Sequence, residues 1–229
     1  MQKKVVVLSL GGSLIIPNDV DFSYLKNFKK TIKANSGKFK FIIVCGGGSV
    51  ARKYISALER EKISRHYQSL AGISATRTNA RFMSYFFNQD SESGIPQKME
   101  QIHNYLRSQN IVFCGALEYK PNQTSDSTSA EIAKHFKTIF INLTDVDGLH
   151  DKNPKKFRDA KFISKISWKD FHEMANKIKY KPGQHFVLDQ KASKIILDEK
   201  IPTYILGKDL KQLSNLLSGK KFRGTEIKN

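Results

Sequence analysis

Two stretches of the chain decide its fold: KVVVLSLGGS at residues 4–13 and KFIIVCGGGS at residues 40–49. Each is a short apolar run, rich in β-branched residues, that ends in glycines. Such runs lack polar alternation and predict buried strands of a mainly parallel sheet with helices on both faces. Segments 22–35 and 50–62, which follow the two strands, have helical spacing. A strand–helix–strand order predicts βαβ units with right-handed crossovers.

The alternation of strand and helix continues beyond these units. We expect further strands at 111–114, 138–143 and 202–206, and further helices at 97–108 and 128–136. The fold class is therefore α/β. With 229 residues, the chain is long enough for one elaborate domain or for two tightly joined lobes.

The composition is that of a globular protein. Hydrophobic residues make up 39% of the chain and charged residues 26%. No run approaches the roughly 20 apolar residues of a membrane span, and the N-terminal segment is too short and too glycine-punctuated for a secretory signal. Cys45 and Cys114 each end an apolar run, where a reduced, buried thiol acts as a small hydrophobic group. We expect a cytoplasmic location and no membrane association.

The net charge of +18 has two interpretations. A basic face binds nucleic acid by releasing counterions from the phosphates. A solvated basic surface attracts small anions such as nucleotides in a general way. Lys residues occur nearly everywhere in this chain, including helix faces that also bear Glu, so the second interpretation is favoured and nucleic acid is not an expected partner. For the densest basic stretch, 151–182, cover of bound phosphates and simple solvation both remain open.

The glycines lie where chemistry is expected. In open parallel sheets, ligands bind at the carboxyl ends of strands, and both Gly11-Gly12-Ser13 and Gly46-Gly47-Gly48-Ser49 follow predicted strands. Glycine lets the backbone approach a phosphate closely. One such loop alone is often only a tight turn, but two together indicate a polyphosphate site. Arg52 follows within one helical turn and is either a bidentate phosphate ligand or a surface residue.

Neither loop matches the common nucleotide motifs, because G-x-x-x-x-G-K-[ST] and a helix-opening G-x-G-x-x-G are both missing from the sequence. The chain instead resembles the amino acid kinase family, and within it the archaeal-type uridylate (UMP) kinases. The resemblance covers nearly the whole chain in family order through GGGSVARKY at 46–54, GISATRTNA at 72–80, TSDSTSAEIA at 124–133, TDVDGLHDKNP at 144–154, FVLDQKASKII at 186–196 and GKKFRGTEI at 219–227.

The order of these motifs predicts a three-layer αβα sandwich with a mainly parallel central sheet, the amino acid kinase fold. Residues 1–135 would form the acceptor (UMP) and oligomerisation lobe, and 136–229 the ATP-binding lobe, on one continuous sheet. The resemblance implies transfer of the γ-phosphoryl group of ATP to UMP, with Mg²⁺ as cofactor. No residue of the chain is expected to be a metal ligand, because the six His residues lack the spacing of a zinc site. The resemblance also implies a homo-oligomer, a hexamer in relatives.

The resemblance further implies roles for single residues. Arg52, between the two nucleotides, and Asp126, which organises the centre, would be catalytic. The residues expected to bind ATP are Gly12, Ser13, Gly48, Arg52, Thr144, His150 and Asn153. Those expected to bind UMP are Gly47, Ser69, Tyr119, Lys120, Pro121, Asn122, Gln123, Thr124 and Ser125. Phosphoryl transfer needs mainly positioning and charge neutralisation, and these residue types supply both.

Four positions depart from the family pattern. Ser9 stands where most members have Lys, and Ser69 where uridylate kinases usually have Asp. His150 replaces a usual Tyr, and Asn153 a usual Asp. Two alternatives therefore remain: an enzyme of the same fold with another small phosphate or carboxylate acceptor, and a non-catalytic protein that binds nucleotides or nucleic acid. Thr124-Ser125-Asp126 also suits a helix N-cap before 128–136, a role that is compatible with ligand binding.

Overall fold

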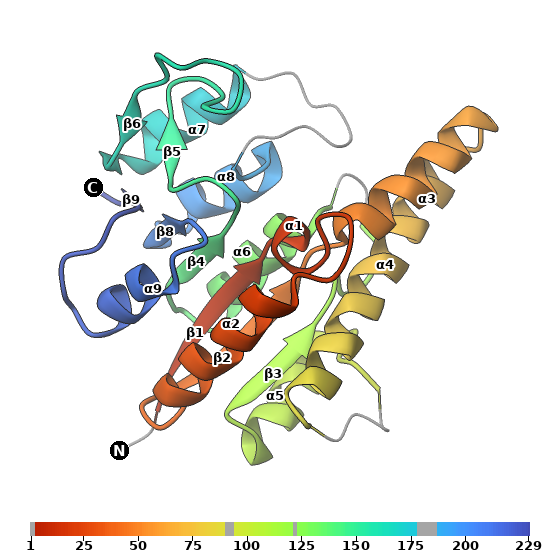
Figure 1. The fold of residues 1–229 in the computed structure, drawn as a ribbon, viewed down its shortest axis with the longest axis horizontal. Coiled ribbons are helices and arrows are strands. Elements are labelled where there is room, and N and C mark those ends of the chain that lie inside the picture. The colour runs from red at the N-terminus through yellow and green to blue at the C-terminus, as the bar shows by residue number, and fades with distance from the viewer. Residues whose placement is uncertain (1–2, 90–93, 121–122, 178–186) are drawn as a thin grey trace.

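A computed structural model describes residues 3–89, 94–120, 123–177 and 187–229. Its centre is a seven-stranded sheet of order β3-β2-β1-β4-β8-β9-β7, beside a two-stranded sheet of β5 and β6 (Figure 1). The strands are β1 Lys4–Leu10, β2 Phe39–Cys45, β3 Ile111–Cys114, β4 Phe140–Leu143, β5 Leu149–His150, β6 Phe162–Ile163, β7 Lys165–Ile166, β8 Thr203–Leu206 and β9 Thr225–Ile227.

Most neighbouring strands are parallel. The pairs from β3 to β8 all run in the same direction, whereas β9 is antiparallel to β8 and β7 is parallel to β9. The expected mainly parallel sheet is confirmed. Strands from both sides of residue 135 belong to this one sheet; the assignment of its two parts to acceptor and donor stays a prediction.

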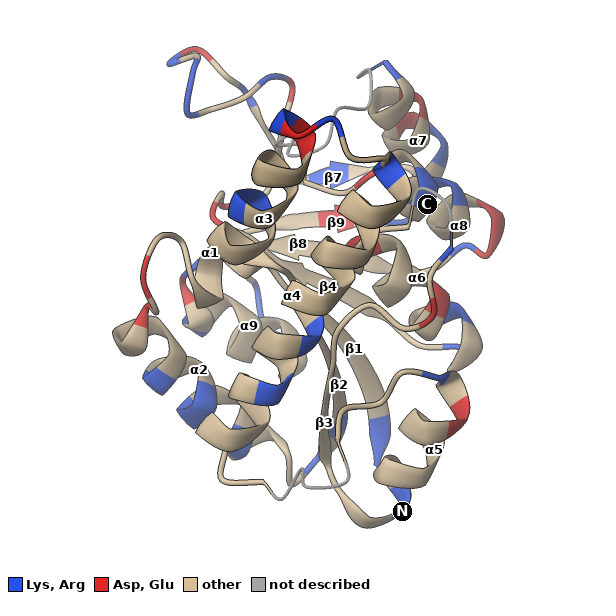
Figure 2. Ribbon diagram, turned by 90° about the vertical axis from the view of Figure 1, so that its right-hand side faces the viewer, with Lys and Arg blue, Asp and Glu red and all other residues tan. Residues whose placement is uncertain are grey.

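Helices cover both faces of the sheet. Figure 2 shows α2 and α9 on one side and α5, α6 and α8 on the other, which confirms the three-layer αβα arrangement. The helices are α1 Gly12–Ile15, α2 Phe22–Asn35, α3 Gly48–Arg60, α4 Arg65–Phe86, α5 Met99–Ser108, α6 Ser125–His135, α7 Trp168–Asn176, α8 Gln190–Asp198 and α9 Leu210–Leu217. None of these helices is long and apolar enough to cross a membrane.

The hydrophobic core forms between these layers. On α2, the side chains of Leu25, Phe28 and Ile32 are fully buried, a spacing that places one helix face against the sheet. Asp21 caps this helix by accepting a hydrogen bond from the Tyr24 amide at 3.0 Å. Cys45 and Cys114 are free and buried. Burial raises the pKa of the Cys114 thiol to about 12, so it stays protonated and inert.

The predicted elements agree with the structure in their order and mostly in their bounds. Strands 4–10 and 111–114 and helix 22–35 coincide with β1, β3 and α2. Strands 138–143 and 202–206 begin late, at Phe140 and Thr203. Helix α4 was not predicted, and the reason is visible on its buried face. There Thr76, Asn79 and Ser84 alternate with Ala75, Ala80 and Met83, so polar side chains conceal the helical period of the apolar ones.

Candidate active site

The two glycine loops touch each other at the carboxyl ends of β1 and β2. A Cβ atom added to Gly12 would lie 2.0 Å from the Gly48 nitrogen, and one added to Gly46 would lie 2.4 Å from the Gly12 nitrogen. Gly48 has φ +61° and begins α3, a conformation that favours glycine. The loops therefore pack backbone against backbone, and their amides lie at one edge of the sheet.

Helix α4 fixes the loops that follow β2 and β3. The buried Asn79 amide donates a hydrogen bond from Nδ2 to the Gly46 carbonyl at 2.7 Å. Thr76 Oγ1 accepts one from the Ala116 amide at 2.9 Å, and Arg77 Nε donates to the Ala116 carbonyl at 3.1 Å. These residues lie in the segment GISATRTNA, but they are not among the site residues predicted from the sequence. Polar side chains among the small residues of this segment are the sequence feature that could have identified them.

Asp126 lies at the N-terminus of α6, next to the end of β1. Its Oδ1 accepts a hydrogen bond from Ser9 Oγ at 2.9 Å, so the residue in the position of the family's usual Lys contacts the predicted catalytic carboxylate. Thr124 caps α6 by accepting from the Asp126 and Ser127 amides, each at 3.1 Å. Burial, and secondly the charge of Asp189, raise the pKa of Asp126 to about 7, although the Ser9 hydrogen bond acts in the opposite direction.

Asp189 is a second carboxylate at this place, and it is not among the site residues predicted from the sequence. It caps α8 by accepting from the Ala192 amide at 2.9 Å, and Thr124 Oγ1 donates to its Oδ2. Thr124 thus connects the N-termini of α6 and α8. The sequence signal was Asp followed by helical spacing in FVLDQKASKII, which is typical of an N-cap.

Hard oxygen donors suit Mg²⁺, which usually keeps several water ligands and binds one or two carboxylates together with substrate phosphates. Asp126 and Asp189 fit this pattern. Among the described residues, no group of three or more His, Cys, Asp or Glu side chains could hold a metal ion by itself.

Of the predicted ATP ligands, Thr144 lies beside the first glycine loop. The Gly11 amide donates to the Leu143 carbonyl at 3.0 Å, and the Thr144 amide donates to the Leu206 carbonyl at 2.9 Å. Ser13, another predicted ATP ligand, follows Gly12 in α1. The ends of β1, β4 and β8 are thereby joined at the same edge as the glycine loops.

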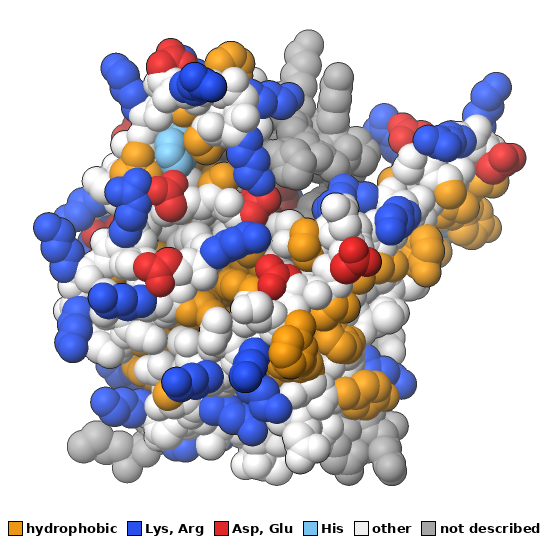
Figure 3. Space-filling view, viewed as in Figure 1, with side chains coloured by type: hydrophobic (Ala, Val, Ile, Leu, Met, Phe, Trp, Pro, Cys, Tyr) orange, Lys and Arg blue, Asp and Glu red, His pale blue; other side chains and the backbone are white. Residues whose placement is uncertain are grey.

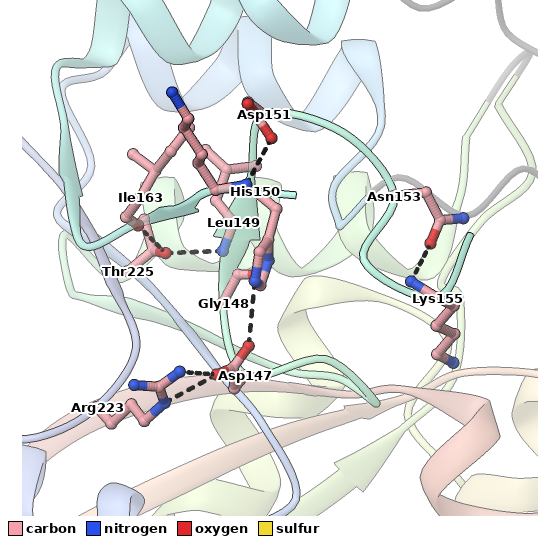
Figure 4. A network of polar contacts seen from close by, with 11 residues as sticks. Asp147, Gly148, Leu149, His150, Asp151, Asn153, Lys155, Ile163, Arg223 and Thr225 are labelled. Carbon is pink, nitrogen blue, oxygen red and sulfur yellow. Dashed lines mark hydrogen bonds and ion pairs between the residues drawn. The ribbon is translucent and has the colours of Figure 1, made fainter. Parts of the chain in front are cut away.

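His150 and Asn153 lie farther along, on the β5 segment and the turn after it (Figure 4). The His150 ring is enclosed, with Nε2 3.5 Å from Asp147 Oδ1 and its ring centre 5.5 Å from that of Phe162. Asn153 Oδ1 accepts from the Lys155 amide at 2.9 Å. Figure 4 shows Arg223 from the end of the chain directed at Asp147 from the other side.

The predicted acceptor residues come from the segment between β3 and the start of α6, from α4 and from the loop after β2. Lys120 Nζ and Gln123 Nε2 both donate to Glu131 Oε2, at 2.9 and 3.0 Å. The Tyr119 ring meets the His66 ring edge-on, with ring centres 4.7 Å apart. The Ser125 carbonyl accepts from Ser129 Oγ within α6.

Three further predicted residues complete the set. Ser69 is on α4, where its hydroxyl donates to the Arg65 carbonyl at 2.8 Å. Gly47 packs between α3 and α4, because a Cβ there would lie 2.4 Å from Ala51 Cβ. Arg52 is exposed and donates from Nη2 to the Pro17 carbonyl at 3.1 Å. Pro121 and Asn122 lie outside the described residues.

Charge is spread over the surface. On the face in Figure 3, Lys and Arg side chains are scattered over many elements and are interspersed with Asp and Glu. This distribution agrees with a general attraction for anionic small molecules.

The chain is similar to known proteins over nearly its whole length. Residues 4–207 match the model described as "Amino acid kinase family". The protein "Uridylate kinase" of Thermoplasma volcanium is 33% identical over 97% of this chain and 96% of its own length. That of Thermococcus kodakarensis is 30% identical over 97% and 98%. The crystal structure of the uridylate kinase from Archaeoglobus fulgidus superposes with a TM-score of 0.83 at 30% identity, covering 97% of this chain and 99% of that one.

Proposed function

Because the chain belongs to the amino acid kinase family, we propose that it is a kinase that transfers the γ-phosphoryl group of ATP to UMP and so forms UDP. The observation that carries the proposal is the backbone contact between the two glycine loops, next to the Ser9–Asp126 hydrogen bond. This arrangement offers amides for two phosphate groups and a carboxylate at one edge. The uridylate kinases that the chain resembles over 97% of its length support UMP as the acceptor.

The residues of this chain would act mainly by positioning. Phosphoryl transfer involves little covalent chemistry for the protein, which must bring two anions into line and neutralise charge. Amides of Gly12 and Gly48 would hold the ATP phosphates, and Gly47 would approach the UMP phosphate. Arg52 would lie between donor and acceptor, where a planar guanidinium can bind phosphate bidentately.

Asp126 would organise the centre rather than act as a base. Its hydrogen bond from Ser9 orients the carboxylate from the end of β1, in a place where most of the family has a Lys charge. Mg²⁺ is the proposed cofactor, with Asp126 and Asp189 as its protein ligands, and when bound it would neutralise charge on the transferred group.

The acceptor would be held by hydroxyls and amides of the segment after β3, with Ser69 in the ribose position. Residues 1–135 would thus be the acceptor lobe and 136–229 the donor lobe. A homohexamer in the cytoplasm is the proposed state of the protein. Exposed aromatic side chains on α2, α3 and α4 support self-association: Phe22, Tyr54, Tyr67 and Tyr85.

A panel of acceptors tests the proposal. The purified protein is incubated with ATP, Mg²⁺ and each of UMP, CMP, AMP, GMP, isopentenyl phosphate and carbamate, and ADP formation is followed. We expect turnover with UMP far above that with the others. Preference for another acceptor would assign a different kinase of the same fold. Tight ATP binding without any turnover would indicate a non-catalytic nucleotide-binding protein.

Two variants make the panel specific to the proposed site. Arg52→Ala should lower kcat/KM for UMP strongly while changing the free energy of unfolding by under about 0.5 kcal/mol, since an exposed side chain contributes little to stability. Lys53→Ala removes the neighbouring exposed charge and should leave both quantities near the wild-type values. Equal effects of the two substitutions would show that Arg52 has no special role.

A further inference from the structure

The last residues of the chain are seated against the end of β8, close to the loop that carries His150. A Cβ added to Gly224 would lie 2.4 Å from Leu206 Cδ2 and 2.7 Å from the Ile205 carbonyl oxygen. The Phe222 ring packs edge-on against Tyr204, with ring centres 5.9 Å apart. The backbone on both sides of Arg223 is therefore fixed. The Arg223 amide itself donates to Gln212 Oε1 at 2.8 Å.

From this fixed backbone, the Arg223 side chain binds the loop after β4. Its Nε donates to Asp147 Oδ2 at 2.8 Å, and its Nη2 lies 2.5 Å from the same oxygen (Figure 4). The guanidinium carbon lies 4.9 Å from the centre of the Phe162 ring, in the range of a cation–π contact. One side chain thus contacts Phe162 of β6 and Asp147, which lies just before β5.

The two groups that Arg223 contacts are the same two that enclose His150. Asp147 Oδ1 faces His150 Nε2 at 3.5 Å, and the Phe162 ring meets the His150 ring at 68°. His150 Nδ1 lies 3.2 Å from the Gly148 carbonyl, so an acceptor oxygen faces each ring nitrogen and the Phe162 ring covers one flank. The His150 side chain is only 9% exposed, whereas that of Arg223 is 64% exposed.

The turn between Asp147 and His150 leaves little other freedom. A Cβ on Gly148, which has φ +152°, would lie 2.6 Å from Phe162 Cε2 and 2.7 Å from Thr225 Oγ1. Thr225 Oγ1 also accepts from the Leu149 amide at 2.7 Å and donates to the Ile163 carbonyl at 2.6 Å. The backbone is thus pinned by Thr225, and the side-chain orientation of Asp147 depends on Arg223.

We propose that Arg223 is a positioning residue for the donor nucleotide, which acts through Asp147 and Phe162 to hold His150 in the orientation that binds ATP. This inference rests on the proposed function and on the expectation from the family resemblance that His150 binds ATP. The competing interpretation is an exposed ion pair that only anchors the end of the chain. Exposed ion pairs contribute little to stability, so the two interpretations differ in what the substitution of Arg223 should change.

The test compares Arg223→Gln with Lys221→Gln. Lys221 is exposed and lies two residues before Arg223, so its substitution removes the same charge from a neighbouring position. Binding of a non-hydrolysable ATP analogue is measured by titration calorimetry, KM is measured for ATP and for UMP, and the midpoint of thermal unfolding is recorded. We expect Arg223→Gln to weaken analogue binding and raise KM for ATP by about fivefold, with KM for UMP and the unfolding midpoint nearly unchanged. Lys221→Gln should behave as the wild type.

Two further variants locate the effect. Arg223→Lys keeps the charge but loses the planar fork, so it should recover part of the ATP affinity. In a His150→Ala background, Arg223→Gln should have almost no additional effect, because residues that act through one another are not additive. Additive losses in the double variant would overturn the proposed route through His150.

The outcomes separate this inference from the proposed function. If the wild type binds the analogue and Arg223→Gln binds it equally well, the inference fails and the kinase assignment stands. If KM for ATP, KM for UMP and the unfolding midpoint all shift together, Arg223 is a structural anchor. If Arg223→Gln does not fold, Asp147→Asn removes the other partner and is measured instead with the same expectation. A wild type that binds no analogue overturns both proposals.

Discussion

The edge where the two glycine loops meet and the loop that carries His150 are built in different ways. At the glycine edge, backbone touches backbone with no room for a Cβ atom on Gly12, and the buried Asn79 fixes the Gly46 carbonyl. In the His150 loop, the buried Thr225 pins the backbone, but the Asp147 side chain is held at the surface by Arg223, and the two are exposed by 42% and 64%. The first region should therefore fail abruptly when altered, and the second should weaken by degrees.

The largest effect should come from Gly12→Ala, which breaks the glycine edge. The new methyl group would lie 2.0 Å from the Gly48 nitrogen, and the contacting atoms are backbone that cannot move without separating the two loops. We expect a loss of at least about 3 kcal/mol in the free energy of unfolding, together with loss of activity. Urea denaturation and the UMP assay measure the two effects.

Gly37→Ala is the matched control, because an added Cβ there meets nothing within 4 Å. It should leave stability unchanged or raise it by about 0.4–1 kcal/mol through the unfolded chain. If Gly12→Ala changes the free energy of unfolding as little as Gly37→Ala does, the two loops are not in rigid contact, and the glycine edge is no more rigid than the His150 loop.

Asp126→Asn should make the protein more stable at alkaline pH while it lowers kcat by about 100-fold. The pKa of Asp126 is raised from 3.8 to about 7 in the folded protein, so the folded state binds an additional proton between these pH values. The stabilisation that this proton gives the folded wild type is fully present below pH 4 and is lost as the pH rises through about 7. Each pKa unit corresponds to about 1.4 kcal/mol, which sets an upper limit of about 4 kcal/mol.

The measurement is the difference in unfolding free energy between wild type and Asp126→Asn at pH 4 and pH 8, without nucleotide or metal. The difference should be near zero at pH 4 and favour the variant at pH 8. Asp19→Asn, at an exposed position, is the control for the loss of one carboxylate. A variant that is less stable than the wild type at pH 8 would mean that Asp126 is not destabilised by its burial.

Asn79→Ala should have an intermediate effect. It removes the donor to the Gly46 carbonyl and leaves a polar group unpaired beside the glycine loops, which costs about 1–3 kcal/mol. We expect a corresponding fall in unfolding free energy and a rise in KM for both nucleotides, because both glycine loops depend on this contact. Asn104→Ala, on the exposed face of α5, is the control. Equal stabilities of the two variants would argue against a bracing role for α4.

The sequence predicted the glycine edge well because its signals are local. Apolar runs that end in glycine mark buried strands and their loops without knowledge of the rest of the fold. The pairing of Thr124 with Asp189 joins residues 65 positions apart, and that of Arg223 with Asp147 joins residues 76 positions apart. Such contacts depend on how α6 and α8, or β8 and β9, pack together. Helix α4 escaped prediction for another reason, since its buried Thr76 and Asn79 bind loops instead of forming apolar core.

The smallest effect should come from Lys155→Gln, which alters the attachment of the His150 loop. Lys155 Nζ pairs with Asp145 Oδ2 on the segment that leads to His150, and 51% of the Lys155 side chain is exposed. An ion pair that solvent reaches contributes about 0–1 kcal/mol and is screened by salt. We expect unfolding free energy to fall by under about 0.5 kcal/mol and KM for ATP to rise by no more than about twofold, with both differences reduced at 0.5 M NaCl.

Lys156→Gln removes the adjacent exposed charge and should match the wild type at both salt concentrations. If Lys155→Gln instead costs as much as Asn79→Ala and salt leaves the loss unchanged, then the His150 loop is held as firmly as the glycine edge, and its attachment does not weaken by degrees.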